Sequence, residues 1–229
     1  MENDTCIVIT GLVLEEYIES LLITYKNVKH KMIVTWKDQD IKLLQKLENN
    51  GFVIILNDYP AKKCSVNYQT RNIYTGFLKA KEMLFKYVIR MRTDVQCDNF
   101  LKFMGAIRNL YIEKLSCICG QGYTQGYFDG VNHITWDTDY FQDFCIAGPI
   151  NAIIPMFEQE QVEEDGRFPE IFWLETYLCK KNVTANEIKK SFNYFISLME
   201  KNHIIFYWIK ANTRKNLLDH LKKTYRLRY

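Results

Sequence analysis

Short apolar runs alternate with amphipathic stretches along the first 94 residues of the chain. An apolar run of about six β-favouring residues predicts a buried strand, and apolar residues at helical spacing predict a helix. Repeated strand–helix units indicate a mostly parallel sheet with helices packed against it. The predicted strands are 6–12, 30–36, 52–56 and 87–92, and the predicted helices are 15–25, 38–50 and 67–85. Asp38 is expected to cap the second helix and Gly51 to end it.

The pattern changes after residue 94, where the elements become shorter and their order less regular. A loop rich in Gly, Tyr and Gln is expected at 120–130. The predicted helices are 99–111, 149–159, 169–181, 186–201 and 213–226, and the predicted strands are 115–119, 131–136, 144–147 and 204–208. No internal repeat, low-complexity stretch or linker is visible in the sequence, which therefore predicts a single α/β domain over residues 1–229.

The composition fits a soluble α/β domain. With 229 residues, 48% of them hydrophobic and 25% charged, the chain is long enough to bury a substantial core. Its longest apolar runs are far too short to span a bilayer, and its acidic N-terminus does not have the pattern of a signal peptide. The seven cysteines include no C-x-x-C pair, and Cys117 and Cys119 have no nearby histidine that would complete a zinc site. Buried free thiols in a reducing cytoplasm are therefore expected.

The net charge of +3 is unevenly distributed along the chain. Residues 210–229 hold seven Lys or Arg and one Asp, a net charge of +6, so residues 1–209 carry a net charge of −3. A basic tail of this kind can bind an anionic lipid surface, or it can be the solvated face of a final helix. Binding to nucleic acid is not expected, because aromatic residues and cations do not alternate along a groove-forming stretch.

The apolar run that begins at Tyr87 ends abruptly in Arg92, Thr93 and Asp94. Open α/β sheets keep their ligand sites at the carboxyl ends of their strands. A carboxylate in that place can hold Mg²⁺ or Mn²⁺ against the diphosphate of a sugar nucleotide, because the cation bridges the two phosphates and neutralises the leaving group. The residues alone leave two alternatives open: a solvated Asp94 that only ends the strand, and an Arg92 that is paired with a neighbouring Asp.

Polar or small residues also follow the other predicted strands, which end at the same edge of a parallel sheet as Asp94. Arg92 can contact phosphate or ribose, and Asp58 can accept a hydrogen bond from a uracil-type ring or a ribose hydroxyl, unless it only forms a turn before Pro60. Trp36 is expected to be half-buried packing rather than a platform on which a base stacks. The candidate nucleotide-binding residues at strand ends and at the start of the third helix are Thr10, Gly11, Thr35, Trp36, Asn57, Asp58, Gln69, Asn72 and Arg92.

Several short stretches, taken in order, make the sequence recognisable over residues 6–182. They are Val8-Ile9-Thr10-Gly11, Val34-Thr35-Trp36-Lys37, Asn57-Asp58-Tyr59-Pro60, Asn67-Tyr68-Gln69, Gly76-Phe77-Leu78, Tyr87 to Asp94, Asp143 to Gly148 and Pro169-Glu170-Ile171-Phe172. The succession resembles the WavE-type glycosyltransferases of bacterial lipopolysaccharide core synthesis. More broadly, it is similar to small GT-A glycosyltransferases, some of which are encoded by large viruses.

This resemblance implies a GT-A-like domain in which residues 1–97 bind the nucleotide, residues 98–185 bind the acceptor and residues 186–229 form a helical, basic C-terminal part. The implied activity is a metal-dependent transfer of a hexose-type sugar from a nucleotide sugar to a saccharide acceptor in surface glycan or glycoconjugate synthesis. A UDP-sugar is the expected donor, and Asp94 is the implied ligand of Mn²⁺ or Mg²⁺. The expected location is the cytoplasm or the cytoplasmic face of a membrane, and the host cytoplasm if the chain is viral.

Two positions depart from the pattern of the family. Tyr68 stands where the family has the Arg of Asn-Arg-Gln, so Arg71, one helical turn along, is the expected substitute beside the nucleotide. Arg92-Thr93-Asp94 stands in place of the Asp-x-Asp of many GT-A enzymes. Only the last carboxylate of this stretch would then meet the metal.

An inverting transfer, which is the expected course, needs a carboxylate that takes the proton from the attacking hydroxyl. The resemblance points to Glu170, which follows Pro169 at a predicted helix start, where the helix dipole keeps a carboxylate ionised. The same place is also simply favourable for a glutamate. Asp143 is the second candidate, and Glu175 ranks below both because it is rotated away along the helix.

Two other functions stay open. A nucleotidyltransferase that makes sugar nucleotides would need a Gly-rich, basic loop after the first strand, and residues 10–15 contain one Gly and no Lys or Arg. The other is a catalytically degenerate module that binds sugars or nucleotides, because Tyr68 and the absent first Asp each remove an expected group.

Overall fold

Residues 2–62, 64–97, 99–112, 126–128, 131–133, 145–158, 172–173, 176 and 206–208 are described by the computed structural model. The elements predicted at 115–119, 186–201 and 213–226 lie outside these residues, as do Asp143, Glu170 and Glu175. The division of the chain into a nucleotide half, an acceptor half and a basic tail stays a prediction.

A five-stranded sheet forms the centre of the molecule, in the order β3-β2-β1-β4-β8. Its first four strands along the chain run parallel, and β8 joins β4 antiparallel at one edge. The strands are β1 (Thr5–Thr10), β2 (Lys31–Trp36), β3 (Val53–Asn57), β4 (Tyr87–Arg92) and β8 (Cys145–Pro149). The predicted fold class, an α/β domain with a mostly parallel central sheet flanked by helices, is confirmed.

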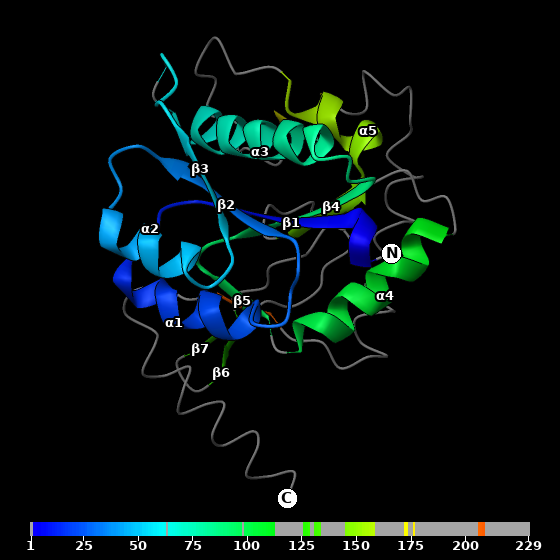
Figure 1. Ribbon diagram of the computed structural model, residues 1–229, viewed down its shortest axis with the longest axis horizontal. Helices are drawn as coiled ribbons and strands as arrows, with labels where there is room; N and C mark the ends of the chain where they lie inside the picture. Colours follow the sequence, from blue (N-terminus) through cyan, green and yellow to red (C-terminus); the bar gives the residue numbers. More distant parts are fainter. Residues whose placement is uncertain are drawn as a thin grey trace, which may run out of the picture.

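Helices cover both faces of this sheet (Figure 1). On one face lie α3 (Ser65–Glu82) and α5 (Ile150–Ile153), and on the other lie α1 (Glu15–Thr24), α2 (Ile41–Glu48) and α4 (Phe100–Ile112). The helix predicted at 149–159 is short in the structure, because α5 passes directly into a 3₁₀ turn at Ile154–Met156. None of the described helices combines the length and apolar character that crossing a bilayer requires.

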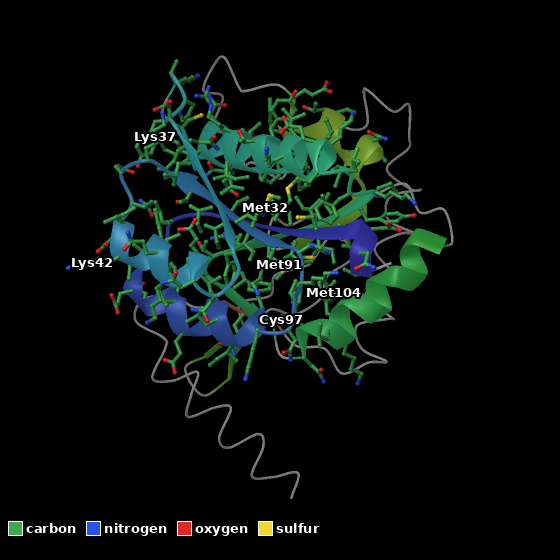
Figure 2. The ribbon with its side chains drawn as sticks, in the orientation of Figure 1. Met32, Lys37, Lys42, Met91, Cys97 and Met104 are labelled. Carbon is green, nitrogen blue, oxygen red and sulfur yellow. The ribbon has the colours of Figure 1, made fainter. Side chains whose placement is uncertain are left out.

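Two hydrophobic clusters hold the layers together, one on each face of the sheet. All six residues of β1 are buried, so its side chains alternate between the two clusters. Met32 of β2 belongs to the cluster under α3, and Met91 of β4 belongs to the cluster against α1 and α4 (Figure 2). Burial on both faces explains why these strands read as continuous apolar runs rather than as alternating ones.

A second, smaller sheet has the order β5-β9-β7-β6. Its strands are β5 (Val95–Cys97), β6 (Gly126–Phe128), β7 (Val131–His133) and β9 (Phe206–Trp208). Strands β7 and β9 fall within predicted strands, whereas β5 was not predicted and β6 lies in the stretch predicted as a loop. Only Thr93 and Asp94 separate β4 from β5, so the candidate site residue Asp94 lies where the chain passes from one sheet to the other.

The N-terminal cap of α2 differs from the predicted one. The cap of α2 is Asp40, whose side chain accepts a hydrogen bond from the amide of Lys42 over 2.8 Å, so the prediction of Asp38 was wrong. Asp38 instead accepts from the hydroxyl of Tyr59.

Four cysteines among the described residues are buried and free, in agreement with the expected thiols: Cys6, Cys64, Cys97 and Cys145.

Candidate functional site

The carboxyl ends of β1 and β4 lie side by side at the centre of the sheet. Thr10 is opposite Arg92 in the parallel register, and the amide of Thr93 donates to the carbonyl of Thr10 over 3.2 Å. Gly11 follows with a φ of +139°, and a Cβ atom there would collide with the hydroxyl of Thr93. Both the backbone conformation and the neighbouring side chain therefore require glycine at this position.

A cavity of about 770 Å³ opens at these strand ends. Its size is within the range of pockets that hold small ligands and cofactors. Its walls come from the ends of β1, β2 and β4, from α1 and from the first turns of α3. The predicted site residues that line it are Thr10, Gly11, Trp36, Gln69, Asn72, Arg92 and Asp94.

Arg90 lines the same cavity and was not among the predicted site residues. It lies inside β4, is only 1% exposed, and donates from Nε to the Thr10 hydroxyl over 2.9 Å and from Nη2 to Gln69 Oε1 over 3.3 Å. Both of these acceptors are neutral, and they fix the orientation of the guanidinium. The signal in the sequence was a cation in the middle of an apolar strand, where charged residues are almost never buried unless paired.

Arg92 and Asp94 form a bidentate ion pair across the turn that follows β4. Arg92 Nε donates to Asp94 Oδ1 over 2.8 Å, and Nη2 donates to Oδ2 over 2.7 Å. The side chains are 24% and 15% exposed, respectively, so the pair is shielded from solvent on most sides. Of the alternatives left open by the sequence, a pairing of Arg92 with a neighbouring Asp is therefore present.

The pair, as it stands, does not suit a divalent cation held by Asp94. Both carboxylate oxygens already accept from Arg92, so a cation would have to share them with a guanidinium or displace it. Within the described part of the chain, no group of three His, Cys, Asp or Glu side chains could hold a metal ion. Mn²⁺ or Mg²⁺ therefore remains an implication of the resemblance and is not supported by the geometry of this cavity.

Tyr17 of α1 faces the cavity near this ion pair. Burial raises the pKa of its hydroxyl to about 12, and the negative charges of Asp94 and Glu16 act in the same direction. A side-chain hydrogen bond with Glu16 also raises this pKa, and the hydroxyl is protonated at neutral pH. Tyr17 was not among the predicted site residues.

Three aromatic side chains form another part of the cavity wall. Trp36 and Tyr59 are stacked with ring centroids 4.6 Å apart, and Tyr68 meets both rings edge-on. Trp36 is only 4% exposed and is therefore more deeply buried than the half-buried packing residue that the sequence suggested. Tyr68, which departs from the family pattern, here completes this aromatic group.

The N-terminal end of α3 also reaches the cavity, through Cys64 and Ser65. Cys64 is the N-cap residue, and its side chain makes no capping hydrogen bond. The amides of the first turn carry the positive end of the helix dipole, which favours an anion nearby.

The remaining predicted residues lie elsewhere. Thr35 is fully buried, and its hydroxyl has no hydrogen-bond partner among the described residues. Asn57, Asp58 and Arg71 line a separate hollow of about 490 Å³. There Asn57 donates to Asn72 over 2.8 Å, and Arg71, the expected substitute cation, donates to the carbonyls of Asp58 and Tyr59. Asp143 and Glu170 lie outside the described residues.

Comparison with family models and with curated protein sequences gives no match. Solved structures do match. A 4-diphosphocytidyl-2C-methyl-D-erythritol synthase superposes with a TM-score of 0.51 at 10% identity, over 79% of this chain and 87% of that one. The fold of this chain is therefore similar to that of the synthase.

Two further structures give lower scores. The corresponding synthase from Anaerococcus prevotii DSM 20548 has a TM-score of 0.49 at 14% identity, over 85% of this chain and 99% of that one. A protein from Desulfovibrio desulfuricans G20 assigned as a nucleotide-diphospho-sugar transferase has a TM-score of 0.45 at 10% identity, over 88% of this chain and 78% of that one. The narrower resemblance to the WavE-type family stays a prediction.

Proposed function

We propose that this chain is a transferase that uses a nucleoside diphosphate sugar, and that the cavity at the ends of β1 and β4 binds the donor. The observation that carries this proposal is the presence of two guanidinium groups, Arg90 and Arg92, in one cavity at the centre of a mostly parallel sheet. That place in the sheet is where α/β folds bind ligands, and guanidinium groups recognise phosphates.

Glycosyl transfer is the reaction we favour, in line with the resemblance to WavE-type and other GT-A enzymes. The hydroxyl of an acceptor sugar would attack the anomeric carbon of the donor, the bond from that carbon to the phosphate oxygen would break, and a nucleoside diphosphate would leave. The guanidinium groups would stabilise the negative charge that develops on the departing phosphate. The proton of the hydroxyl would pass to a carboxylate.

Glu170 and Asp143 are the candidates for that carboxylate. Support for Asp143 comes from Cys145, which follows it by two residues in the sequence. Cys145 pairs with Met91 of β4 in the antiparallel ladder. Since Met91 is one residue from the end of β4, Cys145 lies near the edge of the sheet that carries the cavity. Support for Glu170 rests on the resemblance alone. Direct displacement by the acceptor would invert the configuration of the anomeric carbon.

Transfer of a nucleotidyl group is the second candidate, and the fold similarity to a 4-diphosphocytidyl-2C-methyl-D-erythritol synthase favours it. In that reaction a sugar phosphate would attack the α-phosphate of a nucleoside triphosphate and release pyrophosphate. The loop between β1 and α1 counts against it. The amide of Val13 in this loop is already engaged by Gln39 Oε1 over 2.7 Å, and residues 11–14 contain no cation that could hold a triphosphate.

A paired assay distinguishes the two reactions. Purified protein is incubated with a panel of sugar nucleotides, with UDP-sugars first, and release of nucleoside diphosphate is measured with and without simple saccharide acceptors. In parallel, nucleoside triphosphates are supplied with sugar 1-phosphates, and release of pyrophosphate is measured. We expect release of nucleoside diphosphate that depends on a saccharide acceptor. The rate of this release should fall at least about 100-fold when the carboxylate that acts as the base is replaced, as Glu170→Gln or Asp143→Asn. Pyrophosphate release without glycosyl transfer would replace the first proposal by the second.

We also propose a location for the enzyme and the nature of its acceptor. The basic segment 210–229 would hold the enzyme at an anionic membrane surface on the cytoplasmic side, where an acceptor carried by a lipid would be within reach. A saccharide of a surface glycan or glycoconjugate is the proposed acceptor.

A further inference from the structure

We propose that the cavity holds the diphosphate of its ligand on protein cations, with Arg90 as the principal anion-binding residue, and that this binding needs no divalent metal ion. This inference deepens the proposed function and rests on it for the nature of the ligand. It differs from the metal-dependent site that the resemblance implies.

Arg90 is held in a fixed orientation at the cavity. Its guanidinium is almost completely buried, yet the residue forms part of the cavity lining. The hydroxyl of Thr10 and the amide oxygen of Gln69 take hydrogen bonds from two of its nitrogens, and both of these residues line the cavity as well. These two bonds anchor the edge of the guanidinium formed by Nε and Nη2, so a phosphate would be met by the edge formed by Nη1 and Nη2.

The charge of the described cavity lining is positive. Arg90, Arg92 and Asp94 are the charged side chains among these residues, which gives a net charge of +1. The N-terminal end of α3 adds its partial positive charge at Cys64 and Ser65. The net positive charge of these lining side chains favours a diphosphate anion over a divalent cation that arrives without one.

Asp94 acts in this arrangement as the partner of Arg92 rather than as a metal ligand. The two parallel hydrogen bonds of the pair hold the Arg92 guanidinium at the cavity wall. Both carboxylate oxygens of Asp94 accept from Arg92, so its contribution to the ligand is to position a second cation.

Calorimetric titration of the full chain tests the inference directly. The probes are UDP, uridine and inorganic pyrophosphate, each in EDTA and in MnCl₂. We expect the affinity of the wild type for UDP in EDTA to remain within about threefold of its value in MnCl₂, and uridine to bind far more weakly in both. In Arg90→Gln, UDP should bind about 10-fold to 100-fold more weakly, while the affinity for uridine is unchanged.

Lys37→Gln is the matched control, because it removes one positive charge from an exposed residue that does not line the cavity. Its affinity for UDP should equal that of the wild type. If Arg90→Gln fails to fold, as judged by circular dichroism and thermal melting, Arg90→Lys takes its place. That variant keeps the charge and loses the planar fork, so we expect UDP to bind roughly 3-fold to 10-fold more weakly.

The outcomes separate this inference from the proposed function. UDP binding that disappears in EDTA and returns with MnCl₂ would overturn the inference and leave the proposed function standing, as would a folded Arg90→Gln with unchanged affinity for UDP. Binding of pyrophosphate in EDTA without binding of any nucleotide would support the anion site and contradict the proposed function. Failure of both UDP and pyrophosphate to bind under any condition would overturn the inference.

Discussion

Replacing both members of the Arg92–Asp94 pair should reveal a strong coupling between them. The donor–acceptor distances are 2.8 and 2.7 Å, and the side chains are 24% and 15% exposed. Exposed pairs contribute up to about 1 kcal/mol, and the loss of one partner of a fully buried pair costs about 3–5 kcal/mol. A pair that is mostly shielded falls between these limits. We therefore expect a coupling free energy of about 1–2 kcal/mol.

The assay is a double-mutant cycle in urea, with Arg92→Gln, Asp94→Asn and the double variant compared with the wild type. The pair Lys37–Asp58 is the matched control, since its Nζ···Oδ2 distance is also 2.7 Å but its side chains are 60% and 74% exposed. Its coupling should stay below about 0.5 kcal/mol. A coupling at Arg92–Asp94 no larger than that of the control would refute the reasoning that burial strengthens this ion pair.

Three more predictions follow from the packing, from a histidine and from the tail. Gly76→Ala should lower the free energy of unfolding by about 0.5–2 kcal/mol, because the new Cβ would collide with Val8; Gly105→Ala, with nothing within 4 Å, should raise it, and equal effects in urea denaturation would contradict this. Burial and the charge of Lys29 lower the pKa of His30 below 6.5. The contribution of the neutral His30 to the free energy of unfolding should therefore be fully present above pH 6.5 and be lost as the pH falls below that value. Thermal melting of His30→Gln should show a smaller loss between pH 7.5 and 5, and an identical loss would count against this cause. The full chain should co-sediment with vesicles rich in phosphatidylserine, whereas a chain that ends at residue 209 should not. Equal co-sedimentation of the two chains would contradict a role of the tail in lipid binding.

The central sheet was predictable because its strands are buried on both faces. Runs such as 31–36 and 87–92 contain enough adjacent apolar residues to be recognised without any knowledge of their neighbours. The three-residue strands β5 and β6 carry no such signal, because their pairing with β9 and β7 depends on segments distant in the sequence or on a short hairpin. The cap of α2 was misplaced by two residues, since Asp38 and Asp40 both precede the helix and only the local backbone decides between them.

The position of the cavity was predictable from the sequence, but the contacts among its lining residues were not. The rule that ligands bind at the carboxyl ends of parallel strands correctly grouped Thr10, Gly11 and Asp94 around one cavity. It also suggested Asn57 and Asp58, although β3 at the edge of the sheet delivers them to a different hollow. Arg90 was overlooked because strand patterning treats an interior cation as an interruption. The hydrogen bond from Arg90 to Gln69 on another element cannot be read from spacing along the chain.

The two-residue turn at Thr93 and Asp94 connects the large sheet to the small one, since β4 ends at Arg92 and β5 begins at Val95. A ligand bound to this turn would restrain the connection between the two sheets, and β5 is hydrogen-bonded to β9. Occupancy of the cavity should consequently slow amide hydrogen exchange in β9, a strand more than a hundred residues away in sequence that contributes no residue to the described cavity lining.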